Sequence, residues 1–219
     1  MNNHMYEGLE AKDQKTYLRI LNSDGTIRTT VPEGTQGAVA RVWEAPDGSK
    51  GTKHELVFSR LSGLITDIKF VDGDYGQNLV IEFTKGDGVV YLSLGVSSPF
   101  AEDMMKKLPN VDLKKEVIIA PYAFEDERGK TKKGVTLYQD GTEPENKVGN
   151  FFQEWDNDKK QFIYKNDYPK PKGDTSTYSS DKWKAYFLDC RIFLTEYTEK
   201  NIVSQFGAPA PVSDDDVPF

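Results

Sequence analysis

In QNLVIEFTKGDGVVYLSLGVSSPFAEDMMKKLPN (Gln77–Asn110), the hydrophobic period changes partway along the stretch. Its first half holds two runs in which apolar residues alternate with other residues, separated by the turn Lys85–Gly88, and this pattern is typical of half-buried strands. In its second half Phe100, Met104 and Leu108 recur four residues apart, which is the spacing of one helix face. The stretch therefore predicts two strands followed by a short helix.

Strand patterns flank this stretch on both sides. KHELVFSRLSGLITDIKFVD (Lys53–Asp72) is typical of a long strand with a bend or bulge at Gly63. KEVIIAPYAF (Lys115–Phe124) and GVTLYQDG (Gly134–Gly141) predict two more strands. The resulting order of three strands, a helix and two strands is that of an OB-fold, a five-stranded Greek-key barrel. A doubly wound sheet would alternate strands with helices throughout. We therefore predict a mainly β protein built on such a barrel.

Four segments are predicted around the barrel. They are an N-terminal arm and β extension (1–52), an aromatic- and lysine-rich insertion (142–178), a long C-terminal helix (181–206) and a disordered acidic tail (207–219). Barrel, insertion and helix together make up the core unit, residues 53–206. The insertion is expected to form a hairpin around the turn Asp156–Lys159, because a long structureless loop is unusual within a compact domain.

Composition restricts the class of protein. The 219 residues carry a formal net charge of −7, so any basic surface must be local. Cys190 is the single cysteine, which rules out an intramolecular disulfide and a cysteine-based zinc site and favours a reducing compartment. The N-terminus lacks a signal-peptide pattern, and no apolar segment approaches the roughly 18–20 residues that span a bilayer. We therefore expect a cytoplasmic protein without a membrane partner.

The acidic segment SDDDVPF (Ser213–Phe219) is the most specific motif. Its aspartates repel one another and stay solvated, so the segment has no means of folding alone. One interpretation is a DNA mimic that covers a basic groove until nucleic acid displaces it. Another is a docking peptide whose carboxylates meet a basic rim while the ring of Phe219 enters a pocket. A segment without a role is the third interpretation.

With the sequence Asp214-Asp215-Asp216-Val217-Pro218-Phe219 and the barrel order over residues 53–141, the chain resembles the single-stranded-DNA-binding proteins of DNA replication, most closely those of bacteriophages. The resemblance implies an OB-fold that coats single-stranded DNA in replication, recombination and repair, in the host cytoplasm, without catalysis or cofactor. It also implies that the tail recruits a polymerase, primase or helicase. The N-terminal extension and the helix close to the tail depart from the bacterial housekeeping version, so its tetramer is not carried over.

Candidate DNA-binding residues follow from the physics of single-strand binding, which needs cations along the backbone and flat rings for stacking. The cations of the loop between the fourth and fifth strands are Arg128, Lys130, Lys132 and Lys133. The candidate rings on the sheet and its turns are Tyr91, Tyr75 and Tyr138, each either a stacking platform or ordinary packing. The candidates in the insertion are Phe151, Phe152, Trp155, Lys159 and Lys160.

Signatures of catalysis are missing from the sequence. There is no Walker A loop, HExxH motif or nucleophile elbow. DGDYGQN (Asp72–Asn78) lacks the closing Glu of a calcium loop, so we expect a turn and no metal site. The aromatic stripe of the 181–206 helix is predicted to be a packing face, with a homodimer contact as the alternative. Two other functions remain open: a replisome adaptor whose barrel binds protein, and a DNA-processing nuclease.

Overall fold

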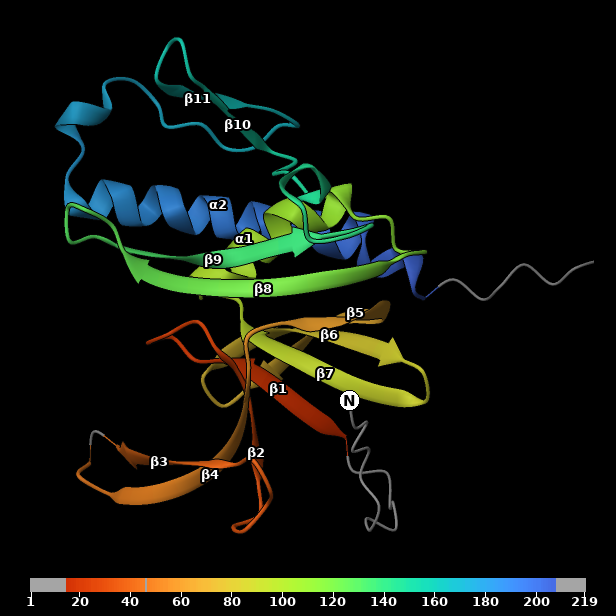
Figure 1. Ribbon diagram of the computed structural model, residues 1–219. Coiled ribbons are helices and arrows are strands. Elements are labelled where there is room, and N and C mark those ends of the chain that lie inside the picture. The colour runs from red at the N-terminus through yellow and green to blue at the C-terminus, as the bar shows by residue number, and fades with distance from the viewer. Residues whose placement is uncertain (1–14, 46, 208–219) are drawn as a thin grey trace, which may run out of the picture.

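The computed structural model describes residues 15–45 and 47–207 and is mainly β, as predicted (Figure 1). The strands are β1 (Thr16–Ile20), β2 (Ile27–Val31), β3 (Val39–Glu44), β4 (Lys50–Phe58), β5 (Leu61–Gly73), β6 (Gly76–Lys85), β7 (Gly88–Gly95), β8 (Glu116–Glu125), β9 (Thr131–Tyr138), β10 (Gln153–Asp156) and β11 (Gln161–Tyr164). The α-helices are α1 (Pro99–Lys107) and α2 (Ser180–Asn201), and single 3₁₀ turns cover Leu108–Asn110, Pro144–Asn146, Thr175–Thr177 and Val203–Gln205. Among the described helices, none combines the length and apolarity needed to cross a bilayer.

The main sheet is curled into a half-barrel. Its strand order is β3-β4-β2-β1-β7-β6-β5-β8-β9, with β1 parallel to β7 and the other neighbours antiparallel. The five strands predicted for the barrel are consecutive in this order, from β7 to β9. The predicted closed five-stranded ring is wrong, however, because in the described residues β7 pairs with β1 rather than with β9.

Side chains of α1 occupy the outer edge of β9. Asp103 Oδ2 accepts a hydrogen bond from the N–H of Val135 at 2.8 Å, and Lys107 Nζ donates to the carbonyl oxygen of the same residue. At a free strand edge, backbone N–H and C=O groups such as those of Val135 have no partner strand. The helix therefore satisfies Val135 in the way that a further strand would.

The β1–β2 turn brings the curled sheet back onto β8. Gly25 in this turn has a φ of 70°, and a Cβ placed on it would lie 2.7 Å from the backbone nitrogen of Ala123. Both the left-handed backbone and this close contact require glycine. The β1–β2 turn thus contacts β8 directly, although β1 and β8 are not neighbours in the sheet.

The predicted long strand Lys53–Asp72 is in fact two strands. The chain leaves β4 at Phe58 and enters β5 at Leu61. β4 then pairs with β2 and β3, whereas β5 pairs with β6 and β8. The predicted boundary at residue 52 therefore falls inside β4, which belongs to the N-terminal extension.

Gly63 marks a close backbone approach. A Cβ at this position would lie 2.7 Å from the carbonyl oxygen of Thr84 on β6. The register shift between β5 and β6 comes slightly later, between Ile65 and Asp67. The predicted irregularity of this strand is confirmed, but its place is two residues further on.

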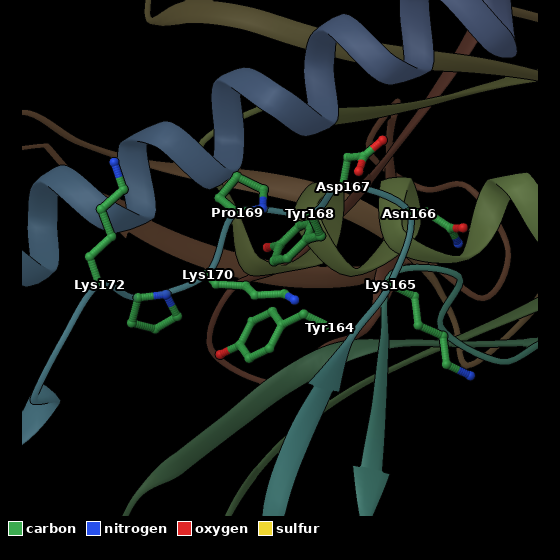
Figure 2. Close-up of a pocket in the computed structure, with 9 residues that line it drawn as sticks. Tyr164, Lys165, Asn166, Asp167, Tyr168, Pro169, Lys170 and Lys172 are labelled. Carbon is green, nitrogen blue, oxygen red and sulfur yellow. The ribbon is translucent and has the colours of Figure 1, made fainter.

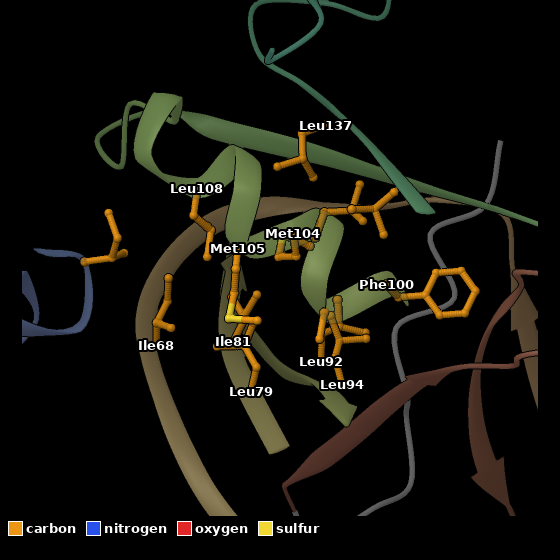
Figure 3. Close-up of a cluster of buried hydrophobic side chains, with 14 of the residues drawn as sticks. Ile68, Leu79, Ile81, Leu92, Leu94, Phe100, Met104, Met105, Leu108 and Leu137 are labelled. Atoms are coloured by element: carbon orange, nitrogen blue, oxygen red, sulfur yellow. The ribbon is translucent and has the colours of Figure 1, made fainter. Parts of the chain in front are cut away.

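The core lies between the inner faces of the strands and α1 (Figure 3). Phe100, Met104 and Leu108 are all buried, which confirms the predicted helix face. The strand residues labelled around them are Ile68, Leu79, Ile81, Leu92, Leu94 and Leu137. Ser98 caps α1, since its side chain accepts from the N–H of Ala101 at 3.1 Å.

The C-terminal helix and the insertion add a second part to this core. α2 begins after an N-cap at Ser179, not at the predicted Asp181. Cys190 and Leu194 from the predicted stripe are buried, whereas Phe187 is half-exposed. The expected hairpin of the insertion is present as β10 and β11. Figure 1 shows this hairpin at the end of the molecule opposite to β3 and β4.

A buried carboxylate ties the N-terminal strands together. Glu55 on β4 has a fully buried side chain and accepts hydrogen bonds from Arg19 on β1, Arg28 on β2 and Arg41 on β3. Arg41 binds both carboxylate oxygens, at 2.8 and 2.9 Å. We call these four residues the Glu55 cluster. The hydrogen bonds from Arg41, followed by those from Arg28 and Arg19, outweigh the effect of burial and lower the pKa of Glu55 to about 2.

We expect Glu55→Gln to destabilise the protein in a pH-dependent manner. The pKa of Glu55 falls from 4.5 to about 2 on folding, so its contribution is complete above pH 4.5 and is lost as the pH falls toward 2. At 1.36 kcal/mol per pKa unit, the contribution at pH 7 is at most about 3 kcal/mol.

Thermal unfolding of wild type and variant between pH 7 and pH 3 measures this effect. The gap between the two melting temperatures should narrow below pH 4.5, because the unfolded wild-type chain then takes up a proton at Glu55 that the folded protein, with its lower pKa, does not. Glu44→Gln, which removes an exposed partner of Lys50, serves as the control and should have little effect at any pH. A gap that stays constant down to pH 3 would contradict this account.

Candidate nucleic-acid interface

The structure places the predicted DNA-binding residues in two separate regions. Tyr91, Tyr75 and the β8–β9 loop belong to the curled sheet, whereas Trp155, Lys159 and Lys160 belong to the β10–β11 hairpin. Figure 1 shows β8, β9 and α2 lying between the hairpin and the strands β1, β6 and β7. A single continuous groove containing every predicted residue is therefore not formed.

On the curled sheet, Tyr91 lies on the face away from the core, as its alternation with Leu92 and Val90 predicts. Its ring lies 5.3 Å from that of Tyr17, its partner on β1, at 30° between planes. The Nζ of Lys15 lies 5.3 Å from the centre of the Tyr91 ring. A hydrogen bond to Glu82 raises the pKa of Tyr91, so its phenol stays neutral. Tyr17 is 53% exposed and presents its ring to solvent.

Two loops flank this tyrosine pair along the strands. Tyr91 on β7 pairs with Glu82 on β6, which pairs with Asp67 on β5. Because Asp67 lies at the middle of β5, the tyrosine pair lies level with the middle of that strand. The β5–β6 turn, with the fully exposed Tyr75, lies at one end of β5. β8 pairs with the other end of β5 and continues past it toward the β8–β9 loop. The tyrosine pair thus lies between these two loops.

The β8–β9 loop is held in shape by Asp126. Its Oδ1 accepts hydrogen bonds from the N–H groups of Arg128 at 3.0 Å and Lys130 at 2.9 Å, and these bonds lower the pKa of Asp126. Among the described residues, the side chains of Arg128 and Lys130 form no ion pair. The loop therefore holds two cations ready for a ligand.

The other two predicted lysines of this hairpin already have partners. Lys132 Nζ is 3.7 Å from a carboxylate oxygen of Asp126, and Lys133 Nζ donates to Asn22 Oδ1 of the β1–β2 turn at 3.3 Å. Opposite Lys132 on β8 lies Phe124, which is 55% exposed. The hairpin thus combines cations with an exposed ring.

Three predicted rings are less accessible. Phe152 is fully buried against Tyr168, Phe193 and Tyr197, so its prediction as a stacking residue is wrong. Phe151 is half-buried and packs edge-on against Phe152, with ring centres 5.1 Å apart. Tyr138, also half-buried, lies at the end of β9 away from the β8–β9 loop.

The tip of the β10–β11 hairpin is accessible. Trp155 is 46% exposed and its ring packs edge-on against Phe162, with centres 5.0 Å apart. Lys159 pairs with Asp156 at 3.7 Å, and Lys160 is exposed at a φ of 52°. The exposed surface here combines apolar side chains with residues of both charges.

The segment 164–172, which follows this hairpin, lines an open hollow of about 510 Å³ (Figure 2). The rings of Tyr164 and Tyr168 lie nearly parallel, with centres 6.3 Å apart. Lys165 is paired with Glu154, while Lys170 and Lys172 form no ion pair among the described residues. Burial raises the pKa of Tyr168, which therefore remains a neutral phenol. The hollow is a second basic and aromatic site.

Tyr17 and Phe124 are exposed rings that the sequence analysis missed. Phe124 had a local signal, because it lies on the face of β8 opposite to Val117 and Ile119. Tyr17 had none, since its proximity to Tyr91 depends on a parallel pairing between distant strands. The predicted partner-binding residues of the tail, Asp214, Asp215, Asp216, Val217, Pro218 and Phe219, lie outside the described residues.

Comparison with known proteins adds no relative to these observations. No protein-family model matches the chain, and no curated protein matches it. Within the described ranges, no group of three or more His, Cys, Asp or Glu side chains is placed to hold a metal ion.

The assignment of Phe152 to the core and of Tyr75 to the free surface gives a direct test. Phe152→Ala should lower the free energy of unfolding by about 3–5 kcal/mol, because it removes a fully buried ring. Tyr75→Ala should change it by less than about 0.5 kcal/mol. Urea denaturation followed by circular dichroism measures both values. Equal effects of the two substitutions would contradict the assignment.

Proposed function

We propose that the protein binds single-stranded DNA without regard to base sequence and without catalysis. The observation that carries this proposal is the Tyr17–Tyr91 pair, in which Tyr17 is exposed, with Lys15 beside it, between two loops that supply a ring and two cations without an ion-pair partner among the described residues. Rings can stack on any base, at roughly 1–3 kcal/mol per base, and cations neutralise the backbone. The arrangement supplies both kinds of contact, with rings at the tyrosine pair and cations at Lys15 and in the β8–β9 loop.

The topology supports the same proposal. The order β7-β6-β5-β8-β9, with α1 between the third and fourth of these strands along the chain, is the order of an OB-type barrel. OB-folds bind single strands on the face of their second and third strands, between the loops that join strands one to two and four to five. In this chain the corresponding parts would be β6 and β7, the turn with Tyr75 and the loop with Arg128.

The biological setting that we propose is phage DNA replication, recombination and repair, in the host cytoplasm. The acidic segment Ser213–Phe219 would compete with DNA for the cationic face and recruit a polymerase, primase or helicase. Its charge is opposite to that of Arg128 and Lys130, the two cations without an ion-pair partner among the described residues, which supports the competition. A homodimer is retained as part of this proposal.

A replisome adaptor is the competing function. It is favoured by a group of apolar side chains on α2, namely Phe187, Leu188 and Ile192, which are each about half exposed. An adaptor would use such a face to bind protein. It would not need the tyrosine pair or the free cations of the sheet.

The double variant Arg128→Gln/Lys130→Gln tests the DNA-binding face. Each lost phosphate contact on single-stranded DNA should flatten the plot of log K against log salt by about 0.7, so the pair should flatten it by about 1.4. Fluorescence anisotropy of labelled oligo-dT across a salt series gives the slope.

The matched control is Lys184→Gln/Lys200→Gln, which removes the same charge from α2 and should leave the slope nearly unchanged. Wild-type protein that fails to bind oligo-dT at low salt would favour the adaptor. Cleavage of labelled DNA in the presence of Mg²⁺ would instead indicate a nuclease.

Deletion of Ser213–Phe219 should tighten the binding of oligo-dT, because the deletion removes a competing anion from the protein. The gain should be largest at low salt, where electrostatic competition is least screened. The same anisotropy assay measures it. A variant in which Asp214, Asp215 and Asp216 become asparagines keeps the length of the tail and serves as the control, and its affinity for oligo-dT should match that of the deletion. If both variants bound oligo-dT with the affinity of the wild type, the tail would not compete with DNA.

A further inference from the structure

The Glu55 cluster lies on the same face of the sheet as the tyrosine pair. Arg19 is two residues beyond Tyr17 on β1, so the two side chains point to the same side. Arg28 is directly opposite Arg19 on β2. The face with Tyr17 and Tyr91 therefore continues across β1 into the N-terminal extension.

The cluster presents positive charge to solvent. Its three guanidinium groups are balanced by Glu55 and by Asp24, which binds Arg28 at 2.7 Å, so the net charge is 3 − 2 = +1. Glu55 is enclosed, whereas the side chains of Arg19 and Arg41 are 41% and 26% exposed. The accessible part of the cluster is thus cationic.

The cluster is also connected to the β8–β9 hairpin. Lys133 of β9 donates to Asn22 at 3.3 Å, and Asp24 of the same turn binds Arg28. Gly25, directly after Asp24, brings this turn against β8. Lys133 on β9 therefore lies on one side of the β1–β2 turn, and the arginines of the Glu55 cluster lie on the other side, out to β3.

We propose that bound single-stranded DNA continues from the β8–β9 hairpin onto the N-terminal extension, where Arg19 and Arg41 bind its phosphates. Guanidinium groups match phosphate oxygens through paired N–H donors. Glu55 acts as a positioning residue, because it holds three flexible side chains in place before the ligand arrives. This inference rests on the proposed function and extends its site beyond the five OB-type strands.

The test compares Arg19→Gln, Arg19→Lys and Lys50→Gln. Arg19 makes a single hydrogen bond to Glu55, so its loss disturbs the cluster less than loss of Arg41. Lys50 lies on β4 with its side chain on the opposite face and is the control for charge. Oligo-dT anisotropy across a salt series gives the slope, and thermal unfolding checks that each variant is folded.

Arg19→Gln should flatten the salt slope by about 0.7, while Arg19→Lys and Lys50→Gln keep the wild-type slope. Wild-type binding with an unchanged slope for a folded Arg19→Gln protein would overturn this inference and leave the proposed function intact. Failure of the wild type to bind would remove the proposed function itself.

A second measurement does not depend on the stability of the Arg19 variants. Trp43 lies on β3, two residues from Arg41, and becomes the single tryptophan in the variant Trp155→Phe/Trp183→Phe. Its fluorescence should change when oligo-dT binds, because the DNA reaches β3. Saturated binding without a change in Trp43 fluorescence would overturn the inference.

Discussion

The parallel pairing of β1 with β7 is the contact on which the rest of the structure depends. It joins Thr16–Arg19 to Val90–Ser93 and occupies the edge at which a five-stranded ring would have closed. The sheet consequently opens into a half-barrel and extends into β2, β4 and β3. The same pairing places the ring of Tyr17 beside that of Tyr91 and turns Arg19 toward the same face. A single strand pairing thus determines the shape of the sheet and the composition of its exposed face.

The Glu55 cluster shows how this extension is stabilised without a large apolar core of its own. A carboxylate with three guanidinium partners is stable only because every one of its oxygens is hydrogen-bonded. Apolar side chains of similar volume often stabilise a fold as well as a buried ion network does. The excess of arginines over carboxylates is therefore one ground on which we propose an anionic ligand at this face. The Glu55 cluster together with Asp24 has a positive net charge, although the net charge of the whole chain is negative.

The aromatic residues of segment 142–178 divide between two roles. Phe152 joins α2 in the core, while Trp155, three residues later, is half-exposed at the hairpin. Both lie in the same mixture of rings and lysines, so composition cannot separate them. What separates them is the position of α2, whose Phe193 and Tyr197 cover Phe152. The β10–β11 hairpin and the hollow lined by residues 164–172 lie apart from the curled sheet.

Local periodicity determined much of the fold from the sequence alone. The strands around Gln77–Gly95, the face of α1, the long helix α2 and the β10–β11 hairpin follow from patterns within a few residues, as does the outward side of Tyr91. Tertiary structure alone decided the division of Lys53–Asp72 into β4 and β5, the pairing of β1 with β7 and the three partners of Glu55. The physical reason is that alternation shows which side of a strand is buried, whereas the neighbour that buries it is chosen by contacts between residues far apart in the chain.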